Sequence, residues 1–181
     1  MSDVDRFEAF VLRFQDMVYA TAFRLLGRPA DAEDVAQTVF LRAFERFDQV
    51  GESPAAPGWL KTVTTNLCLN HLARHRARWR LFSEMGRADE DGQVEAFEST
   101  LAALPLTDTI DETDAQAALE AALAALPAHQ RVPLVLFHFE DKPYQVIAEL
   151  LGVSLGKVKT DIHRGREALR RHLSEDDHGP V

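Results

Sequence analysis

Disulfide chemistry, membrane-spanning segments and glycine- or proline-rich repeats are missing from this sequence. Cys68 is the one cysteine among 181 residues, which excludes an internal disulfide framework and fits a reducing cytosol. The 9 Gly and 8 Pro exclude a collagenous chain. No apolar run approaches the ~20 residues that span a bilayer, and residues 1–6 are acidic and lack the apolar core of a secretory signal. With 46% hydrophobic residues, the sequence predicts a globular, cytoplasmic protein without membrane insertion.

Basic residues are scarce overall, but the deficit lies in one segment. The chain has 20 Lys and Arg against 29 Asp and Glu, a net charge of -9. Residues 83–114 hold ten of the acids and one basic residue, with few large apolar side chains, so the flanking parts are nearly neutral. Such a segment buries too little surface to offset its ordering entropy. We therefore expect two small domains, 1–82 and 115–175, joined by a flexible acidic linker. An acidic arm that enters a basic channel of a partner, or that mimics nucleic acid, stays open as an alternative for this linker.

The spacing of apolar residues predicts an all-α fold. Strand patterns are scarce, and apolar residues recur at three- and four-residue steps almost throughout the chain. A first helix is expected to end at Gly27, and a second to begin near Asp31 and continue through Phe47. Residues 51–58 predict a loop. Further helices are predicted over about 59–82, 115–126, 130–139, 143–151 and 155–173.

The second domain carries the spacing of a helix-turn-helix. Ala148, Gly152 and Val158 supply a small residue at the helix crossing, a left-handed turn and an apolar seam. Basic and hydroxyl side chains gather on the second helix, where a helix amino terminus and cations favour DNA in the major groove. The candidate DNA-binding residues are Ser154, Lys157, Lys159, Thr160, His163, Arg164 and Arg166.

The helix predicted over 59–82 is a second candidate for nucleic-acid binding. No acidic residue lies between Lys61 and Phe82, and polar residues at four-residue steps form one stripe from Thr62 to Arg74. Asn and Thr can bond to bases, Arg can hold phosphates, and Trp59 either stacks on an unpaired base or packs in the core. The candidate residues are Trp59, Lys61, Thr62, Asn66, Asn70, Arg74 and Arg76.

Taken together, these segments resemble an extracytoplasmic-function (ECF, group IV) RNA polymerase sigma factor, a bacterial transcription initiation subunit. Residues 31–44 (DAEDVAQTVFLRAF) resemble the family's region 2.2, and residues 57–74 resemble regions 2.3 and 2.4. Region 4 is matched by LPAHQR at 126–131, YQVIA at 144–148, GKVK at 156–159 and HRGR at 163–166.

The resemblance implies a function for each surface. The helix near Asp31 would bind core RNA polymerase, the 59–82 helix would read and open the −10 promoter element, and the helix-turn-helix would read the −35 element. The implied partners are core polymerase, promoter DNA and a regulatory anti-sigma factor, with no cofactor and no enzymatic activity. The implied polymerase-binding residues are Asp31, Glu33, Asp34, Gln37, Phe40, Leu41 and Phe44.

Two departures from the family pattern lie on the recognition helix. Lys157 stands where the family usually has Thr, and Asp161 stands where a basic residue is common, which weakens phosphate contact there. Three other functions stay open. They are a stand-alone helix-turn-helix DNA-binding regulator, a structural helical adaptor, and a helical enzyme with zinc at Cys68, His71 and His75. The zinc hypothesis has only three of the four ligands that a structural site needs.

Overall fold

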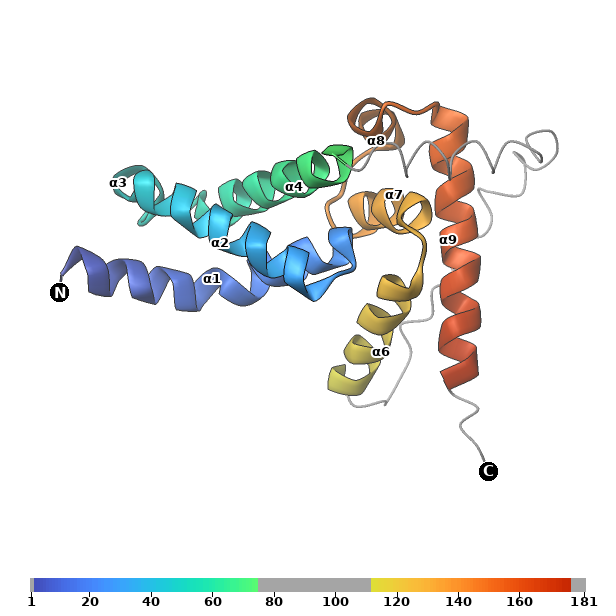
Figure 1. Ribbon diagram of the computed structural model, residues 1–181, viewed down its shortest axis with the longest axis horizontal. Helices are drawn as coiled ribbons and strands as arrows, with labels where there is room; N and C mark the ends of the chain where they lie inside the picture. Colours follow the sequence, from blue (N-terminus) through green and yellow to red (C-terminus); the bar gives the residue numbers. More distant parts are fainter. Residues whose placement is uncertain (1, 75–111, 177–181) are drawn as a thin grey trace.

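The computed structural model describes residues 2–74 and 112–176, and every regular element in these two segments is a helix, which confirms the all-α prediction (Figure 1). No helix within them is long and apolar enough to cross a bilayer. The first domain comprises α1 (Asp3–Leu26), α2 (Pro29–Glu45), α3 (Phe47–Val50) and α4 (Ala56–Arg74). The second comprises α6 (Glu112–Ala125), α7 (Ala128–His138), α8 (Tyr144–Leu151) and α9 (Leu155–Asp176). Of the predicted linker, only the last residues, which begin α6, lie inside the described segments.

A glycine turn joins α1 to α2 and makes these helices antiparallel neighbours. As predicted, α1 ends at Gly27. Gly27 has a φ of 70°, and its amide donates to the Phe23 carbonyl at 2.8 Å, which makes a left-handed cap. Pro29 then begins α2, at a position where its missing amide costs nothing. This start precedes the predicted Asp31. Phe47, which was expected to continue the second helix, instead begins α3.

The core of the first domain is formed by the stripes that α1, α2 and α4 turn toward one another. The apolar period of each helix explains the packing, because residues three and four apart share a face. The buried residues include Phe10, Phe14, Val18, Ala22, Leu25, Val35, Val39, Ala43, Leu60 and Cys68.

The beginning of α4 corrects the predicted loop over 51–58. The helix starts at Ala56, ahead of the predicted Trp59. Pro57 fits there because the first turn of a helix leaves its amides without intrahelical acceptors. The Trp59 amide already donates to the Ala55 carbonyl at 3.0 Å. Pro57 and Gly58, which suggested a loop, therefore belong to the first turn of α4.

In the second domain, α7 packs against α9, and α6 and α8 also contact α9. Pro133 lies inside α7 and is buried. Pro143 is the N-cap of α8, which begins at Tyr144, one residue after the predicted start at 143. Ile147, Val158 and Ile162 are fully buried between α8 and α9 and their neighbours, which fixes the helix-turn-helix on the rest of the domain.

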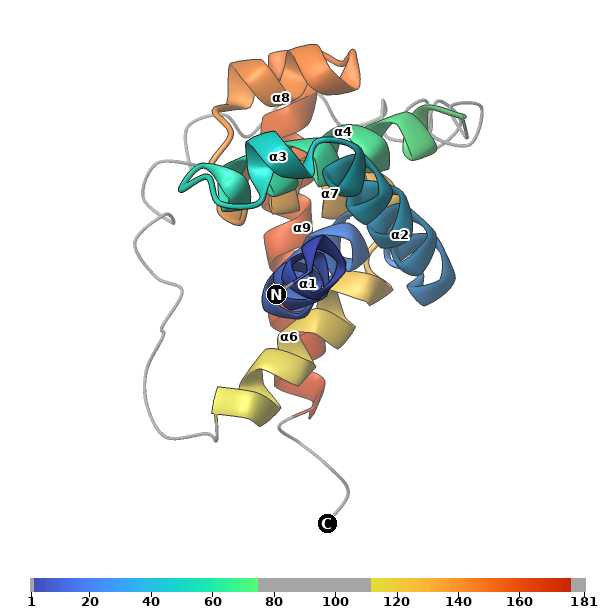
Figure 2. The same ribbon diagram turned by 90° about the vertical axis from the view of Figure 1, so that its left-hand side faces the viewer.

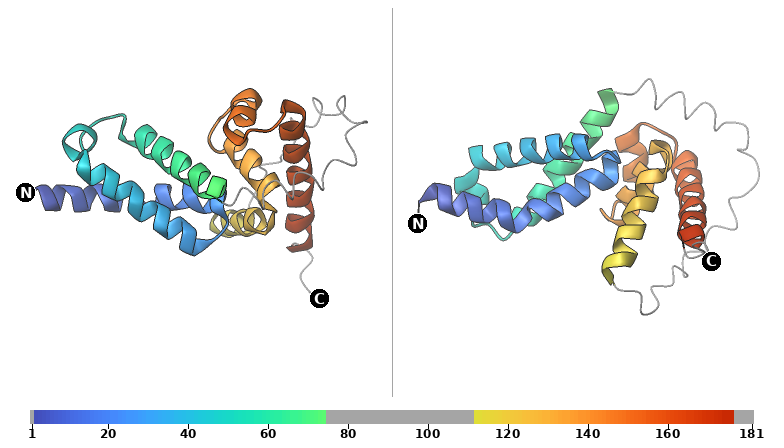
Figure 3. Two further views of the ribbon diagram at one scale, coloured as in Figure 1. Left: turned by 45° about the horizontal axis from the view of Figure 1, so that its top comes forward. Right: turned by 60° about the horizontal axis from the view of Figure 1, so that its bottom comes forward.

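The carboxyl end of α1 contacts α6 and α7, so the two domains touch (Figures 2 and 3). Arg131 of α7 is buried at this contact and donates to the Leu25 carbonyl at 3.3 Å and the Leu26 carbonyl at 3.0 Å. Its third acceptor is the Leu126 carbonyl at 2.8 Å, within its own domain. These carbonyls lie at the carboxyl ends of α1 and α6, where no amide of the same helix can donate to them. A cation is therefore favoured there.

Candidate polymerase- and DNA-binding surfaces

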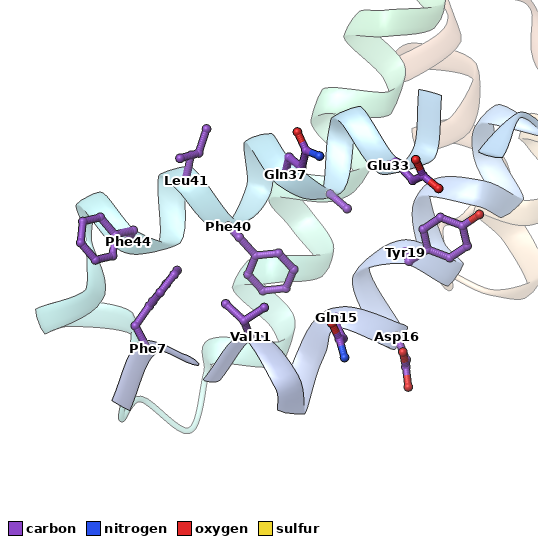
Figure 4. Close-up of a pocket in the computed structure, with 11 residues that line it drawn as sticks. Phe7, Val11, Gln15, Asp16, Tyr19, Glu33, Gln37, Phe40, Leu41 and Phe44 are labelled. Carbon is purple, nitrogen blue, oxygen red and sulfur yellow. The ribbon is translucent and has the colours of Figure 1, made fainter. Parts of the chain in front are cut away.

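An apolar groove of about 690 Å³ runs between α1 and α2 on the outside of the first domain (Figure 4). On α2, Leu41 is 66% exposed and Phe44 is 57% exposed, while Phe40 packs partly against the core. Monomers seldom expose neighbouring large apolar side chains without a binding role. Five of the seven residues predicted to bind polymerase line this groove: Glu33, Gln37, Phe40, Leu41 and Phe44.

The opposite wall of the groove comes from α1, where no polymerase-binding residue was predicted. Phe7 packs edge-on against Phe44, with ring centroids 5.0 Å apart. The apolar repeat of α1 could have indicated this role. Phe7 and Val11 lie at the edge of its apolar stripe, away from the buried centre of the stripe. The residues of α1 that line the groove are Phe7, Val11, Gln15, Asp16 and Tyr19.

The two remaining predicted polymerase-binding residues lie outside the groove. Asp31 forms an ion pair with Arg28 at 3.7 Å and lies 3.5 Å from the His71 ring of α4, so it connects α2 to α4. Asp34 is exposed, and its carbonyl accepts a bond from Thr38 at 3.0 Å. The structure therefore places these two carboxylates beside the groove without bringing them into it.

The predicted polar stripe of α4 lies on the surface. Thr62, Asn66, Asn70 and Arg74 are all exposed, while Cys68 on the opposite face is fully buried. The Thr62 hydroxyl donates to the Gly58 carbonyl at 2.9 Å, which fixes its rotamer and leaves its oxygen lone pairs outward. The stripe presents two amide side chains and a guanidinium at successive turns of one helix.

Other candidates on α4 are less exposed. Trp59 is half-buried and packs against the core, which favours the packing alternative for its ring. Lys61 is also half-buried and lies near Glu140 of the second domain. Burial raises the pKa of the Glu140 carboxyl, and the positive charge of Lys61 is the largest influence that opposes this rise. Arg76 lies outside the described residues.

The helix-turn-helix geometry is as the spacing predicted. Gly152 has a φ of 66° and ends α8, and the Val153 amide returns to the Ala148 carbonyl at 3.1 Å. Val158 is fully buried in the seam between the helices. The Ser154 hydroxyl accepts the Lys157 amide at 3.2 Å and so caps α9. Both Ser154 and Thr160 are exposed at the amino end of α9.

Several cations predicted to bind DNA contact the protein itself. Lys157 Nζ donates to Asp161 Oδ2 at 2.8 Å. The Arg166 guanidinium is buried and lies 3.0 Å from the His138 ring nitrogen Nε2 of α7. His163 Nε2 lies 3.4 Å from Glu167, while Lys159 and Arg164 are half-buried on the same helix. The predicted residues thus share one helix but differ in how freely they can reach a ligand.

The described segments give the zinc hypothesis no support. Among residues 2–74 and 112–176, no three His, Cys, Asp or Glu side chains gather closely enough to hold a metal ion. Burial raises the pKa of the Cys68 thiol to about 12, which opposes the thiolate that zinc requires. His75, the third suggested ligand, lies outside these segments.

Two helical domains, a helix-turn-helix and an exposed polar stripe on a second helix define a two-domain DNA-binding protein. Residues 10–78 match the family Sigma-70 region 2, and residues 116–169 match Sigma-70, region 4. The ECF RNA polymerase sigma factor SigW of Bacillus subtilis is 30% identical over 96% of this chain and 91% of SigW. The chain belongs to the ECF RNA polymerase sigma factors.

Other similar proteins have related descriptions. The ECF RNA polymerase sigma factor SigE of Mycolicibacterium smegmatis is 36% identical over 93% of this chain and 62% of SigE. A solved structure of the sigma factor RpoE from Bartonella quintana, in complex with the anti-sigma factor NepR, has a TM-score of 0.48 and 22% identity. It covers 93% of this chain and 96% of RpoE.

Proposed function

We propose that this chain binds core RNA polymerase through the α1–α2 groove and directs the enzyme to promoters with two separate DNA-binding surfaces. The domain containing α1–α4, residues 1–82, would read the −10 element, and residues 115–175 would read the −35 element, with 83–114 as the connection. The observation that carries this proposal is the presence of three distinct surfaces in one chain. An apolar groove, a polar stripe on α4 and a capped recognition helix each fit a different ligand.

The α4 stripe fits the recognition and opening of the −10 element. Asn66 and Asn70 can bond to base edges, and Arg74 can hold a phosphate. Strand opening then draws its free energy from trapping unpaired bases on this surface and from polymerase contacts. The chain itself performs no covalent chemistry in this proposal, and it acts in the cytoplasm, where polymerase and promoter meet.

An anti-sigma factor is the regulatory partner that fits these surfaces. It would compete with polymerase for the apolar groove beside Leu41, and with DNA or polymerase for exposed apolar side chains of the helix-turn-helix such as Leu150. Exposed apolar side chains on both domains favour a partner that contacts both.

A DNA mobility-shift assay with and without core polymerase tests the proposed function. A sigma factor is expected to bind a promoter fragment tightly and specifically only when core polymerase is present. The main alternative, a stand-alone helix-turn-helix regulator, binds its site without polymerase, at a Kd of about 10⁻⁸ M or tighter. Tight, sequence-specific binding by the chain alone, unchanged by polymerase, would refute the proposal.

A further inference from the structure

The recognition helix α9 contains a closed pair of opposite charges on the side that packs toward α7. Lys157 and Asp161 are one helical turn apart, and their charged atoms are 2.8 Å apart. The Asp161 side chain is only 5% exposed and the Lys157 side chain 18% exposed. The side chains of an ordinary surface ion pair are far more exposed than these two. The Lys157 side chain therefore lies along α9 toward Asp161 and away from solvent.

The surroundings of Asp161 hold this arrangement in place. Its neighbours at positions 158 and 162 are fully buried, which fixes the direction of the Asp161 side chain toward the domain interior. Lys157, His129 of α7 and Arg164 of α9 act on its carboxylate, and Lys157 donates a hydrogen bond to it. Releasing Lys157 toward DNA would remove a hydrogen-bonded cation from a buried carboxylate, which is costly.

We propose that Asp161 is a specificity-determining residue of the −35 surface, because it withholds Lys157 from the DNA backbone. This inference rests on the proposed role of α9 in reading the −35 element. A phosphate contact adds affinity for every sequence, whereas a contact to a base edge adds affinity only for the correct one. By removing one sequence-independent contact, Asp161 leaves recognition more dependent on exposed groups such as Thr160.

The salt dependence of promoter binding tests this proposal directly. The full chain and its variants are assembled with core polymerase, and the Kd for a promoter fragment recovered by runoff transcription is measured over a range of salt. We expect Asp161→Asn to free Lys157 and add one phosphate contact. The slope of log K against log salt then steepens by about 0.9, an extra affinity loss of about 3.5-fold between about 50 and about 200 mM salt. Asp161→Asn should also discriminate less well against a fragment with a scrambled −35 element.

Two further variants make the result specific. The double variant Lys157→Met with Asp161→Asn removes the freed cation and should return the slope to that of the wild type. Lys159→Met, two residues away, should make the slope shallower by about 0.9, because Lys159 is expected to contact a phosphate. A wild-type slope for Asp161→Asn beside a shallower slope for Lys159→Met would overturn the inference alone. Wild-type slopes for all variants would overturn the −35 role of α9 as well.

Lysine acetylation gives a readout that needs no DNA. With the folded full chain and a limiting amount of acetylating reagent, mass spectrometry reports the rate at each lysine. In the wild type we expect Lys157 to react several-fold more slowly than Lys159, and in Asp161→Asn we expect the two rates to converge. Equal rates in the wild type would contradict the pairing.

Discussion

At the scale of single residues, the contact between Arg166 and His138 ties α9 to α7. His138 Nε2 accepts from Arg166 Nε at 3.0 Å, so the imidazole must be neutral, with its proton on Nδ1. Partial burial lowers the pKa of His138 from 6.5, and the charge of Arg166 lowers it further. The ring of Phe137, 5.7 Å from the guanidinium carbon, covers the other side of Arg166. A residue predicted to read DNA therefore contributes to the packing of its own domain.

This contact predicts an acid-sensitive contribution to stability. A histidine whose pKa is lowered by folding binds a proton more readily in the unfolded chain. The free energy of unfolding therefore falls as the pH drops through 6.5 toward the folded-state pKa. His138→Gln keeps an acceptor for Arg166 and removes the titration, so it should lose less stability on acidification. We expect the difference to be small, because water screens the exposed part of the ring.

Denaturant unfolding of the two proteins at about pH 7 and about pH 5.5 measures this difference. His172→Gln, on the same domain, serves as the control and should follow the wild type. Identical acid sensitivity of the wild type and His138→Gln would show that the His138 contact does not titrate in this range.

At the scale of elements, the α1–α2 groove makes a sharp prediction about polymerase binding. Leu41 lines the groove and is 66% exposed, and Leu12 of α1 is 63% exposed but does not line it. Leu41→Asp should weaken binding to core polymerase by about 30-fold or more, as expected for a central apolar contact. Leu12→Asp should bind normally. Both variants should melt like the wild type, because neither side chain is packed in the core.

Co-elution of each variant with core polymerase on a sizing column provides the measurement. If Leu41→Asp co-elutes as strongly as Leu12→Asp, the polymerase does not use the groove.

The polar stripe of α4 predicts a separable effect on the −10 element. Asn66→Ala with Asn70→Ala removes two amides from exposed positions, so folding should be unaffected. Each amide that bonds to a base contributes about 1–3 kcal/mol of discrimination. We expect the double variant to lose about tenfold or more in its preference for a correct over a scrambled −10 element, measured by transcription from matched templates. Its preference for the −35 element should stay at the wild-type level, and Gln49→Ala, at an exposed position of α3, should change neither preference.

Local sequence signals predicted the elements well where one residue determines the backbone. Gly27 ends α1 as predicted, Gly152 adopts the predicted left-handed conformation, and Val158 fills the predicted seam. The α4 start was misplaced because Pro57 was taken as a loop residue although a proline also fits a first helical turn. The helices and the turns between them could therefore largely be predicted from the sequence.

Contacts between distant residues could not be predicted in the same way. Arg166 was assigned to DNA because it is a basic residue on the recognition helix. Its contact with His138 was missed because His138 lies in another helix, 28 residues away. Asp161 was predicted to weaken phosphate contact at a position where a basic residue is common, and its burial beside Lys157 depends on how α9 packs against α7. The pattern of charge along a helix gives the face of a residue, but the tertiary neighbour decides whether that residue can reach a ligand.

At the scale of the whole molecule, the contact between the domains sets a condition for promoter recognition. Elements named −10 and −35 are about 25 base pairs, or about 85 Å, apart along B-DNA at about 3.4 Å per pair. A domain of about 70 residues has a radius of gyration of only about 11 Å. Two domains in contact cannot reach both elements, so they must separate when the chain reads a promoter with polymerase.

Arg131 is expected to control this separation. Its guanidinium donates to three carbonyls, and a Cβ added at Gly27 would lie 2.8 Å from the guanidinium carbon. Arg24 of α1 adds an ion pair with Glu120 at 2.8 Å. Arg131→Met leaves buried carbonyls without donors, at about 1–3 kcal/mol each if the domains stay closed. We therefore expect Arg131→Met and Gly27→Ala to open the molecule and raise its radius of gyration.

Small-angle X-ray scattering of the free chain measures the radius of gyration. Arg170→Met, a substitution at an exposed position on α9, should scatter like the wild type. An Arg131→Met protein with wild-type scattering and wild-type melting would show that Arg131 does not hold the domains together.

Runoff transcription with purified core polymerase tests the central claim most directly. The chain is added to core polymerase and a library of promoter fragments, and the start sites are sequenced. We predict initiation from a discrete set of fragments that share a −10 and a −35 sequence, and none of these transcripts without the chain. An unchanged set of transcripts, with no co-elution of the chain with core polymerase, would contradict it.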